Sequence, residues 1–320
     1  MRRLILLIFF FIPWAASAAS FSSLYVFGDS LSDPGNIPLV SGYNFPPAPY
    51  SANRFSNGPV AVQYLAPLLG LPVDNSKNYA QGGATTGFIN VNNASSGGLV
   101  PGSSLTGVLG QVNDYLYQVS SADPNALYVI WAGPNDLLQG LENPATFDAT
   151  AAIGGALGNL STAITDLKSA GAQHFLIPNM TDLGKTPRLV GTLYQASGTL
   201  LSGLFDKQLA AMLGQLKTGL QADIASFDTF GFLNSVVTDP AQYGFSNVTG
   251  QCLADPACIN NPSVADTYLF WDSIHPTTRG HALLALAMAS TLPAVVPLPS
   301  ALVLLLSGLL VMVGFKKAKG

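Results

Sequence analysis

The sequence predicts an α/β protein with a parallel sheet and helices on both of its faces. Apolar runs at 24–27, 126–131 and 175–177 are continuous rather than alternating in polarity, which is typical of buried parallel strands. Segments with helical spacing alternate with them, at 60–69, 105–117, 149–168, 200–224 and 277–288, the last capped by Thr277. Strands and helices that alternate along a chain favour this architecture.

Two segments interrupt the alternation. Residues 34–49 are rich in Pro, Gly and Asn, and residues 82–110 are rich in Gly, Ser and Asn. Each follows the end of a predicted strand, where ligands bind in open α/β sheets. We expect them to wall a substrate cleft, although Gly-rich loops more often only connect elements.

Both ends of the chain predict export. Arg2 and Arg3 precede an apolar run at 4–14 and the small residues 16–18, as in a secretory signal peptide. These eleven apolar residues are too few to cross a bilayer, which takes about 20. We therefore expect a signal peptide at 1–18 and a folded domain at 19–292.

Residues 293–320 form a Pro-rich hinge, an apolar run and a basic end. Positions 298–315 carry no charge, and Lys316, Lys317 and Lys319 follow. Eighteen residues lie at the lower limit for a spanning helix, and terminal lysines suit a cytoplasmic end. The alternative, a buried core helix, does not usually end in a free basic tail, so we expect a membrane-directed segment.

Charge and cysteine content exclude several functions. Five of the 13 Lys and Arg residues lie in the two ends, so the middle keeps eight against 17 Asp and Glu residues, a net charge of −9. Such a domain lacks the basic face that nucleic acid requires. Cys252 and Cys258 predict a disulfide in an exported protein, with two free thiols as the alternative. No metal or cofactor is implied.

The three histidines are candidates for a general base. His174 lies between a helix and a strand pattern, and His281 falls inside the last predicted helix. His275 precedes that helix, with Asp272 three residues upstream, so a short loop could turn the carboxylate onto the imidazole. The spacing alone favours a catalytic pair and an ordinary turn before a helix cap equally.

A nucleophile is offered by Ser30, in a small-residue turn directly after the first predicted strand. Backbone amides at the start of a following helix could face developing negative charge there. By itself, an ordinary Gly-Asp-Ser turn is commoner. The G-x-S-x-G elbow is absent, because Ser32 occupies its final glycine position.

Two further turns follow strand ends. Gly83 comes after a presumed second strand and could offer a backbone N–H, while Asn135 follows the third strand and could offer a side-chain N–H. Individually, such residues are more often a turn glycine and an Asx-turn asparagine. At the ends of successive strands, however, they converge on the same edge of the sheet.

In this order and spacing, the motifs resemble the GDSL lipases/esterases, also called SGNH hydrolases. The resemblance covers about residues 22–290, and segments 53–58 and 179–187 also look like subfamily features without a catalytic role. It implies a three-layer α/β/α sandwich with a flavodoxin-like parallel sheet, the SGNH hydrolase fold. The matching blocks are Gly28-Asp29-Ser30-Leu31, Gly83, Gly133-Pro134-Asn135-Asp136 and Asp272-Ser273-Ile274-His275.

The resemblance also implies a secreted serine esterase or lipase that acts on a small ester or a lipid. Ser30 would attack the carbonyl, His275 would accept its proton, and Asp272 would orient His275. The N–H groups of Ser30 and Gly83 and the Asn135 amide would hold the oxyanion. Acyl transfer to an alcohol and a non-catalytic surface module are the alternatives; a binding module has no need of all five residues.

The tail resembles the PEP-CTERM sorting signal of Gram-negative bacteria. Val296-Pro297-Leu298-Pro299 precedes the apolar run and the basic end, with Leu298 in place of the usual Glu. The resemblance implies location in the Gram-negative envelope or outside the cell, with membrane insertion and processing by a sorting enzyme through the tail.

Overall fold

The computed structural model describes residues 21–292. The predicted signal peptide at 1–18 and the predicted tail at 293–320 lie outside the described residues. Within the described range, no helix is both long and apolar enough to span a membrane.

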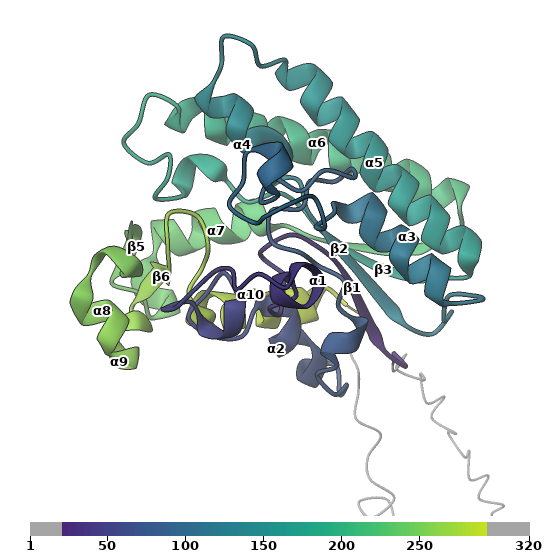
Figure 1. Ribbon diagram of the computed structural model, residues 1–320, viewed down its shortest axis with the longest axis horizontal. Coiled ribbons are helices and arrows are strands. Elements are labelled where there is room, and N and C mark those ends of the chain that lie inside the picture. The colour runs from purple at the N-terminus through teal and green to yellow at the C-terminus, as the bar shows by residue number, and fades with distance from the viewer. Residues whose placement is uncertain (1–20, 293–320) are drawn as a thin grey trace, which may run out of the picture. The chain divides into compact units, whose positions relative to one another are not determined.

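The central sheet has four parallel strands in the order β1–β2–β3–β4 (Figure 1). Gly28 pairs with Trp131 at the end of the first two strands, and Pro178 pairs with Phe227 at the end of the last two. The carboxyl ends of all four strands therefore meet at one edge of the sheet. The strands are β1 (Leu24–Gly28), β2 (Leu127–Trp131), β3 (His174–Pro178) and β4 (Asp223–Phe227).

Helices cover both faces of this sheet, which confirms the predicted three-layer α/β/α sandwich (Figure 1). On one face, alternate strand residues such as Phe27, Tyr128 and Phe175 pack against the helices in the largest hydrophobic cluster. That layer comprises α3 (Val108–Gln118), α4 (Pro134–Glu142), α5 (Ala149–Ala170) and α6 (Gln195–Gly219), and the opposite layer includes α2 (Ala61–Leu68) and α10 (Thr278–Thr291).

The presumed second strand before Asn78 is wrong. Only an isolated parallel bridge joins Asn78 to Val26, extended by a hydrogen bond from the Tyr79 N–H to the Val26 carbonyl (2.8 Å). The preceding residues favour turns: the Asp74 side chain caps a short 3₁₀ helix at Asn75–Lys77. The turn that contains Gly83 nevertheless lies beside the carboxyl end of β1, because the Gln81 N–H donates to the Gly28 carbonyl (3.1 Å).

The predicted helix over 200–224 is also wrong at both ends. Helix α6 begins at Gln195 and ends at Gly219, and residues 223–227 form strand β4. Strand β4 has no partner on its outer side in the described sheet, and its Asp223 is exposed. Its residues include the polar Asp223 and Ser226, so β4 lacks the continuous apolar run that identified the other strands.

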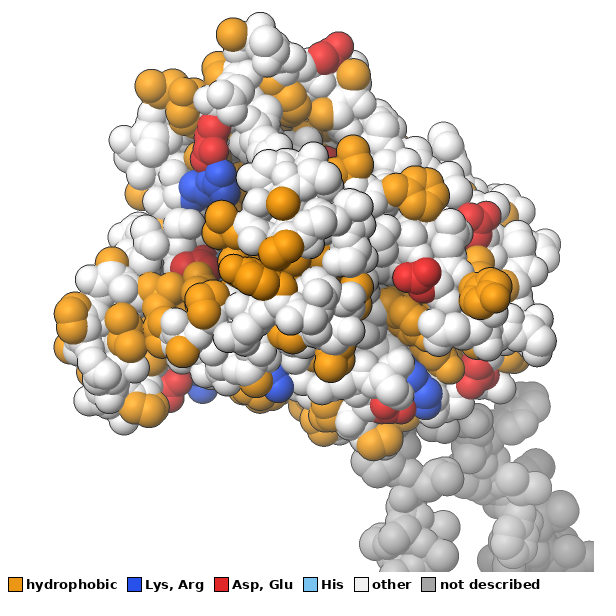
Figure 2. All heavy atoms as spheres, viewed as in Figure 1, with side chains coloured by type: hydrophobic (Ala, Val, Ile, Leu, Met, Phe, Trp, Pro, Cys, Tyr) orange, Lys and Arg blue, Asp and Glu red, His pale blue; other side chains and the backbone are white. Residues whose placement is uncertain are grey.

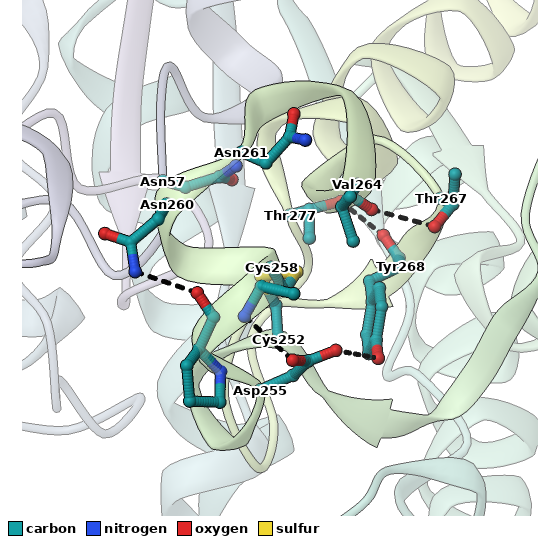
Figure 3. Close-up of a disulfide and its surroundings, with 12 residues drawn as sticks. Asn57, Cys252, Asp255, Cys258, Asn260, Asn261, Val264, Thr267, Tyr268 and Thr277 are labelled. Atoms are coloured by element: carbon teal, nitrogen blue, oxygen red, sulfur yellow. Dashed lines mark hydrogen bonds between the residues drawn. A yellow bond between two sulfur atoms is a disulfide. The ribbon is translucent and has the colours of Figure 1, made fainter.

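A second small sheet supports the segment that precedes α10. It pairs β5 (Asn247–Gln251) with β6 (Tyr268–Phe270) and carries α8 (Pro256–Asn260) and α9 (Pro262–Ala265). The predicted disulfide is present: it joins Cys252 to Cys258, whose Cα atoms lie 5.3 Å apart (Figure 3). The neighbouring Leu253 N–H donates to the Trp271 carbonyl (2.9 Å), so this loop is tied directly to the residue before Asp272.

Candidate active site

The turn after β1 places Ser30 at the carboxyl edge of the sheet. Gly28 packs so closely against β2 that a Cβ there would overlap the Trp131 carbonyl oxygen. The Asp29 carboxylate accepts the Leu31 N–H (3.0 Å), which fixes the turn around the serine. Burial raises the pKa of Asp29 to about 7, although the Leu31 N–H acts in the opposite direction.

Ser30, His275 and Asp272 form one hydrogen-bonded line. The His275 Nε2 lies 2.7 Å from the Ser30 Oγ, and its Nδ1 lies 2.7 Å from the Asp272 Oδ2. The second oxygen of Asp272 accepts the N–H groups of Ile274 (2.8 Å) and His275 (2.7 Å), so the loop folds back on its own carboxylate. A proton on Nδ1 leaves Nε2 as the acceptor for the serine hydroxyl.

The Asp272 carboxylate is ionised in this arrangement. Burial by itself would raise its pKa, but the charge of His275 and the hydrogen bonds from His275 and Ile274 outweigh burial and lower the pKa to about 2. The Tyr50 hydroxyl also donates to the Asp272 Oδ2 (2.8 Å). Burial and the neighbouring carboxylate raise the pKa of Tyr50, so it remains a neutral donor. Sequence reasoning missed Tyr50, and no motif around it signals this contact.

Segment 53–58, to which the sequence assigned no catalytic role, holds the histidine loop. The Phe55 ring lies 5.0 Å from the His275 ring. The Ser56 hydroxyl donates to the Pro276 carbonyl (3.0 Å), and the Asn57 side chain accepts the Thr278 N–H (2.7 Å). These contacts fix both the ring and the start of α10.

Gly83 and Asn135 are brought to the same site. Gly83 has a left-handed backbone with φ of 81°, and Asn135 lies in the first turn of α4, where its amide donates to the Ala84 carbonyl (2.9 Å). The adjacent Asp136 accepts both the N–H and the hydroxyl of Thr86, so α4 and the glycine turn are fastened together. Within residues 21–292, the N–H groups of Ser30 and Gly83 donate to no protein acceptor.

The site opens into a cavity of about 200 Å³. Ser30, Gly83, Asn135 and His275 line it, whereas Asp272 and Tyr50 do not. The remaining wall is mostly apolar and comes from α4, α10, the small second sheet, α7 (Thr229–Thr238) and the loops that carry Leu183 and Ile274. Of these parts, the motifs identify only α4 and Ile274. The apolar residues of this wall include Leu138, Leu183, Phe232, Leu269, Ile274 and Leu284.

The other two histidines lie elsewhere. His174 begins β3 at the amino edge of the sheet, where its Nδ1 lies 3.1 Å from the Asp223 carboxylate. His281 is fully buried in α10, and neither ring nitrogen has a hydrogen-bond partner among the described residues. Burial lowers the pKa of His281 to about 3, so the ring is neutral. Across residues 21–292, no group of three or more potential ligand side chains is placed to hold a metal ion.

In serine hydrolases, a serine hydroxyl hydrogen-bonds a histidine ring whose other nitrogen is hydrogen-bonded to a buried carboxylate. This arrangement and the parallel three-layer fold define the site as one of the serine hydrolase class. The chain belongs to the GDSL-like lipase/acylhydrolase family, whose model matches residues 24–288.

Known proteins are similar in sequence to this chain over most of the domain. An uncharacterized protein of the trpE–trpG intergenic region of Pseudomonas putida is 34% identical over 297 residues, covering 84% of this chain and 48% of the relative. Esterase EstA of Pseudomonas aeruginosa is 32% identical over 315 residues, covering 84% and 46%. The chain thus spans about half the length of these two relatives. Among solved structures, the acetylxylan esterase Axe2 of Geobacillus stearothermophilus aligns with a TM-score of 0.45 and 15% identity, over 86% of this chain and 95% of that one.

Proposed function

We propose that the chain hydrolyses carboxylic esters with Ser30 as the nucleophile. The observation that carries this proposal is the line from Asp272 through His275 to Ser30, with 2.7 Å at each step, opening into a mostly apolar cavity. The family and the esterase among its relatives support the same chemistry.

In this mechanism, the Ser30 Oγ attacks the ester carbonyl while His275 Nε2 takes its proton. Asp272 stabilises the imidazolium that forms, and its low pKa keeps it charged throughout. His275 then protonates the departing alcohol, leaving the acyl group on Ser30. Water, deprotonated by His275, attacks the acyl-enzyme and releases the acid.

The tetrahedral intermediates carry an oxyanion that needs donors. Ser30 and Gly83 line the cavity beside Asn135, and their N–H groups donate to no protein acceptor within residues 21–292. The second N–H of the Asn135 amide is not used by Ala84. Donors that are already fixed before the reaction stabilise the developing charge without reorganisation. We assign the oxyanion hole to these three groups.

A series of p-nitrophenyl esters from acetyl to palmitoyl tests the function and measures the preferred acyl length. We expect release of p-nitrophenol with at least part of the series. Adding an alcohol acceptor separates hydrolysis from acyl transfer, because transfer would yield a new ester in place of the free acid. Failure to cleave any acyl length would contradict the proposal.

Asn135→Ala should lower kcat by about 10²–10³-fold and change KM little, because an oxyanion donor acts in the transition state. The Michaelis parameters of the variant on the best ester of the series measure this. Asn159→Ala is the matched control, because this half-buried amide donates to the Thr86 hydroxyl (3.1 Å) and does not line the cavity. An effect on KM alone would instead make Asn135 a binding or turn residue.

We further propose that the chain is exported and that residues 293–320 address it to the Gram-negative envelope. The support is the sequence pattern of the two ends. A chain ending at Ala294 should be folded and as active as the full chain. In the native host the full chain should fractionate with the envelope, and the shortened one should appear free in the periplasm or medium. Loss of folding or activity on shortening would make the tail part of the domain.

A further inference from the structure

Six large apolar side chains are exposed on the loops that surround the candidate active site. They lie on the two segments that interrupt the strand–helix alternation, 34–49 and 82–110. We call them the rim patch: Leu39, Val40, Tyr43, Phe88, Ile89 and Leu99.

The first part of the rim patch lies next to a buried residue, Ile37, that fixes its helix to the domain. Helix α1 (Ile37–Ser41) buries Ile37 in one cluster with Phe55, the residue that packs on His275. Leu39, two positions later, is 83% exposed. The Asp33 carboxylate fixes the approach to α1, because it accepts the Asn36 N–H (2.6 Å) on one side and the Gly82 N–H (2.7 Å) on the other.

The second part lies on a turn that begins and ends at the cavity. The Val91 N–H donates to the Gly83 carbonyl (2.9 Å), and both residues line the cavity. Between them, the Thr85 N–H donates to the Ile89 carbonyl (3.0 Å), which leaves Phe88 and Ile89 at the tip, 60% and 62% exposed.

Leu99 completes the rim patch. Its neighbour Val100 is buried in the same cluster as Ile37 and pairs with Asn93, next to the cavity residue Asn92. Leu99 itself is 73% exposed. The three parts of the rim patch are therefore anchored on the same cluster or the same turn as the cavity wall.

The rim patch is also free of charge. Residues 34–53 contain no Asp, Glu, Lys or Arg, and neither do residues 78–113. Figure 2 shows hydrophobic and uncharged side chains over α1. Large apolar side chains exposed together mark an interaction site rather than an ordinary surface. The absence of Lys and Arg there argues against an anionic surface, which attracts basic segments.

We propose that the rim patch docks the protein on a lipid–water interface whose head groups are uncharged or zwitterionic, with the cavity mouth turned toward the lipid. The cavity wall is mostly apolar, and its residues Gly83 and Val91 begin and end the turn that carries Phe88 and Ile89. An apolar ester could therefore pass from the interface to Ser30 with little exposure to water. The idea that the interface supplies substrate to the cavity rests on the proposed ester hydrolysis, whereas docking at the interface does not. A second copy of the chain on the patch would instead close the mouth.

Docking is tested without turnover, in the full chain carrying Ser30→Ala. An environment-sensitive dye on Leu99→Cys should shift to the blue when phosphatidylcholine vesicles are added. The same dye on Tyr117→Cys should not shift. This 94% exposed residue lies near the end of α3, whereas the start of α3 contacts the turn that carries Phe88 and Ile89. Replacing part of the lipid with phosphatidylserine should not strengthen the shift. The C-terminal apolar run is common to both labelled chains, so binding through it does not distinguish them.

The kinetic test compares tributyrin in solution with tributyrin dispersed as droplets. The triple variant Leu39→Ser/Phe88→Ser/Leu99→Ser should lower the ratio of droplet rate to solution rate by at least about tenfold, because three apolar contacts with the interface are lost. Its rate on dissolved tributyrin should be unchanged, which also shows that it folds. Tyr117→Ser and Leu286→Ser, which alter exposed apolar residues elsewhere, should leave the ratio unchanged.

The outcomes separate the two proposals. No shift at Leu99, an equal shift at both positions, or an unchanged ratio in the triple variant would overturn docking while hydrolysis of dissolved ester stood. A blue shift at Leu99 without any hydrolysis by the parent chain would support docking and contradict the proposed function. A dye that is already buried before lipid is added, together with a dimer in sedimentation, would assign the rim patch to a second copy instead.

Discussion

Ser30→Ala should lower kcat for ester hydrolysis by at least about 10⁴-fold and leave the fold intact. The Ser30 Oγ hydrogen-bonds the ring that would take its proton, and within the described residues that ring nitrogen contacts no other hydroxyl. Removing the hydroxyl deletes the atom that attacks the carbonyl. The effect on stability should be small, because the exposed Nε2 can then bind water from the cavity.

Ser32→Ala is the matched control for this variant. Ser32 lies two residues further along the same turn, is fully buried, and its hydroxyl has no hydrogen-bond partner among the described residues. Its removal should therefore cost neither activity nor stability. A fluorophosphonate should add mass to the parent chain and the Ser32→Ala protein but not to the Ser30→Ala protein. Labelling or turnover of Ser30→Ala at the parent rate would refute Ser30 as the nucleophile.

The strands that the sequence predicts correctly are those buried on both faces. Strand β2 has all five residues buried, so its composition shows the continuous apolar run of a central parallel strand. Strand β4 lies at the edge and includes the polar Asp223 and Ser226, so its pattern merges with the helix before it. The small second sheet is not predicted for a related reason: the residues of β5 are mostly polar, and all are partly buried or exposed. Strand β1 is also an outer strand, but residues 78–81 cover its outer side, and it keeps the apolar run that β4 lacks.

The structure brings together the five candidate site residues, and the reason is topological. Ser30, Gly83 and Asn135 each follow a segment that runs parallel in the sheet, and parallel segments end at one edge. Tyr50 and Phe55 reach the site differently. The Tyr50 contact with Asp272 spans 222 residues and depends on how an irregular loop packs, so local sequence gives no sign of it. The apolar cavity wall likewise needs the positions of α7 and α10, which periodicity does not supply.

His275→Ala should lower kcat by about 10⁴-fold or more, because it removes both the base for Ser30 and the acid for the leaving alcohol. Asp272, with its pKa of about 2, stays ionised between pH 4 and 9, so protonation of this carboxylate cannot account for a loss of activity in that range. Rates of the parent and the variant on a soluble ester between pH 4 and 9 measure the effect.

Two other histidines supply the controls that make this result specific. His174→Ala alters an exposed contact with Asp223 at the opposite edge of the sheet and should retain activity and the pH profile. His281→Leu replaces a buried ring whose nitrogens have no partner among the described residues, so it should also keep the profile. Below about pH 6.5, the buried His281 ring lowers the free energy of unfolding, because this histidine takes up a proton in the unfolded chain and stays neutral in the folded one. His281→Leu should therefore resist acid unfolding better than the parent, while His275→Ala loses turnover at every pH. An equal loss of turnover in all three variants would leave His275 without its assigned role.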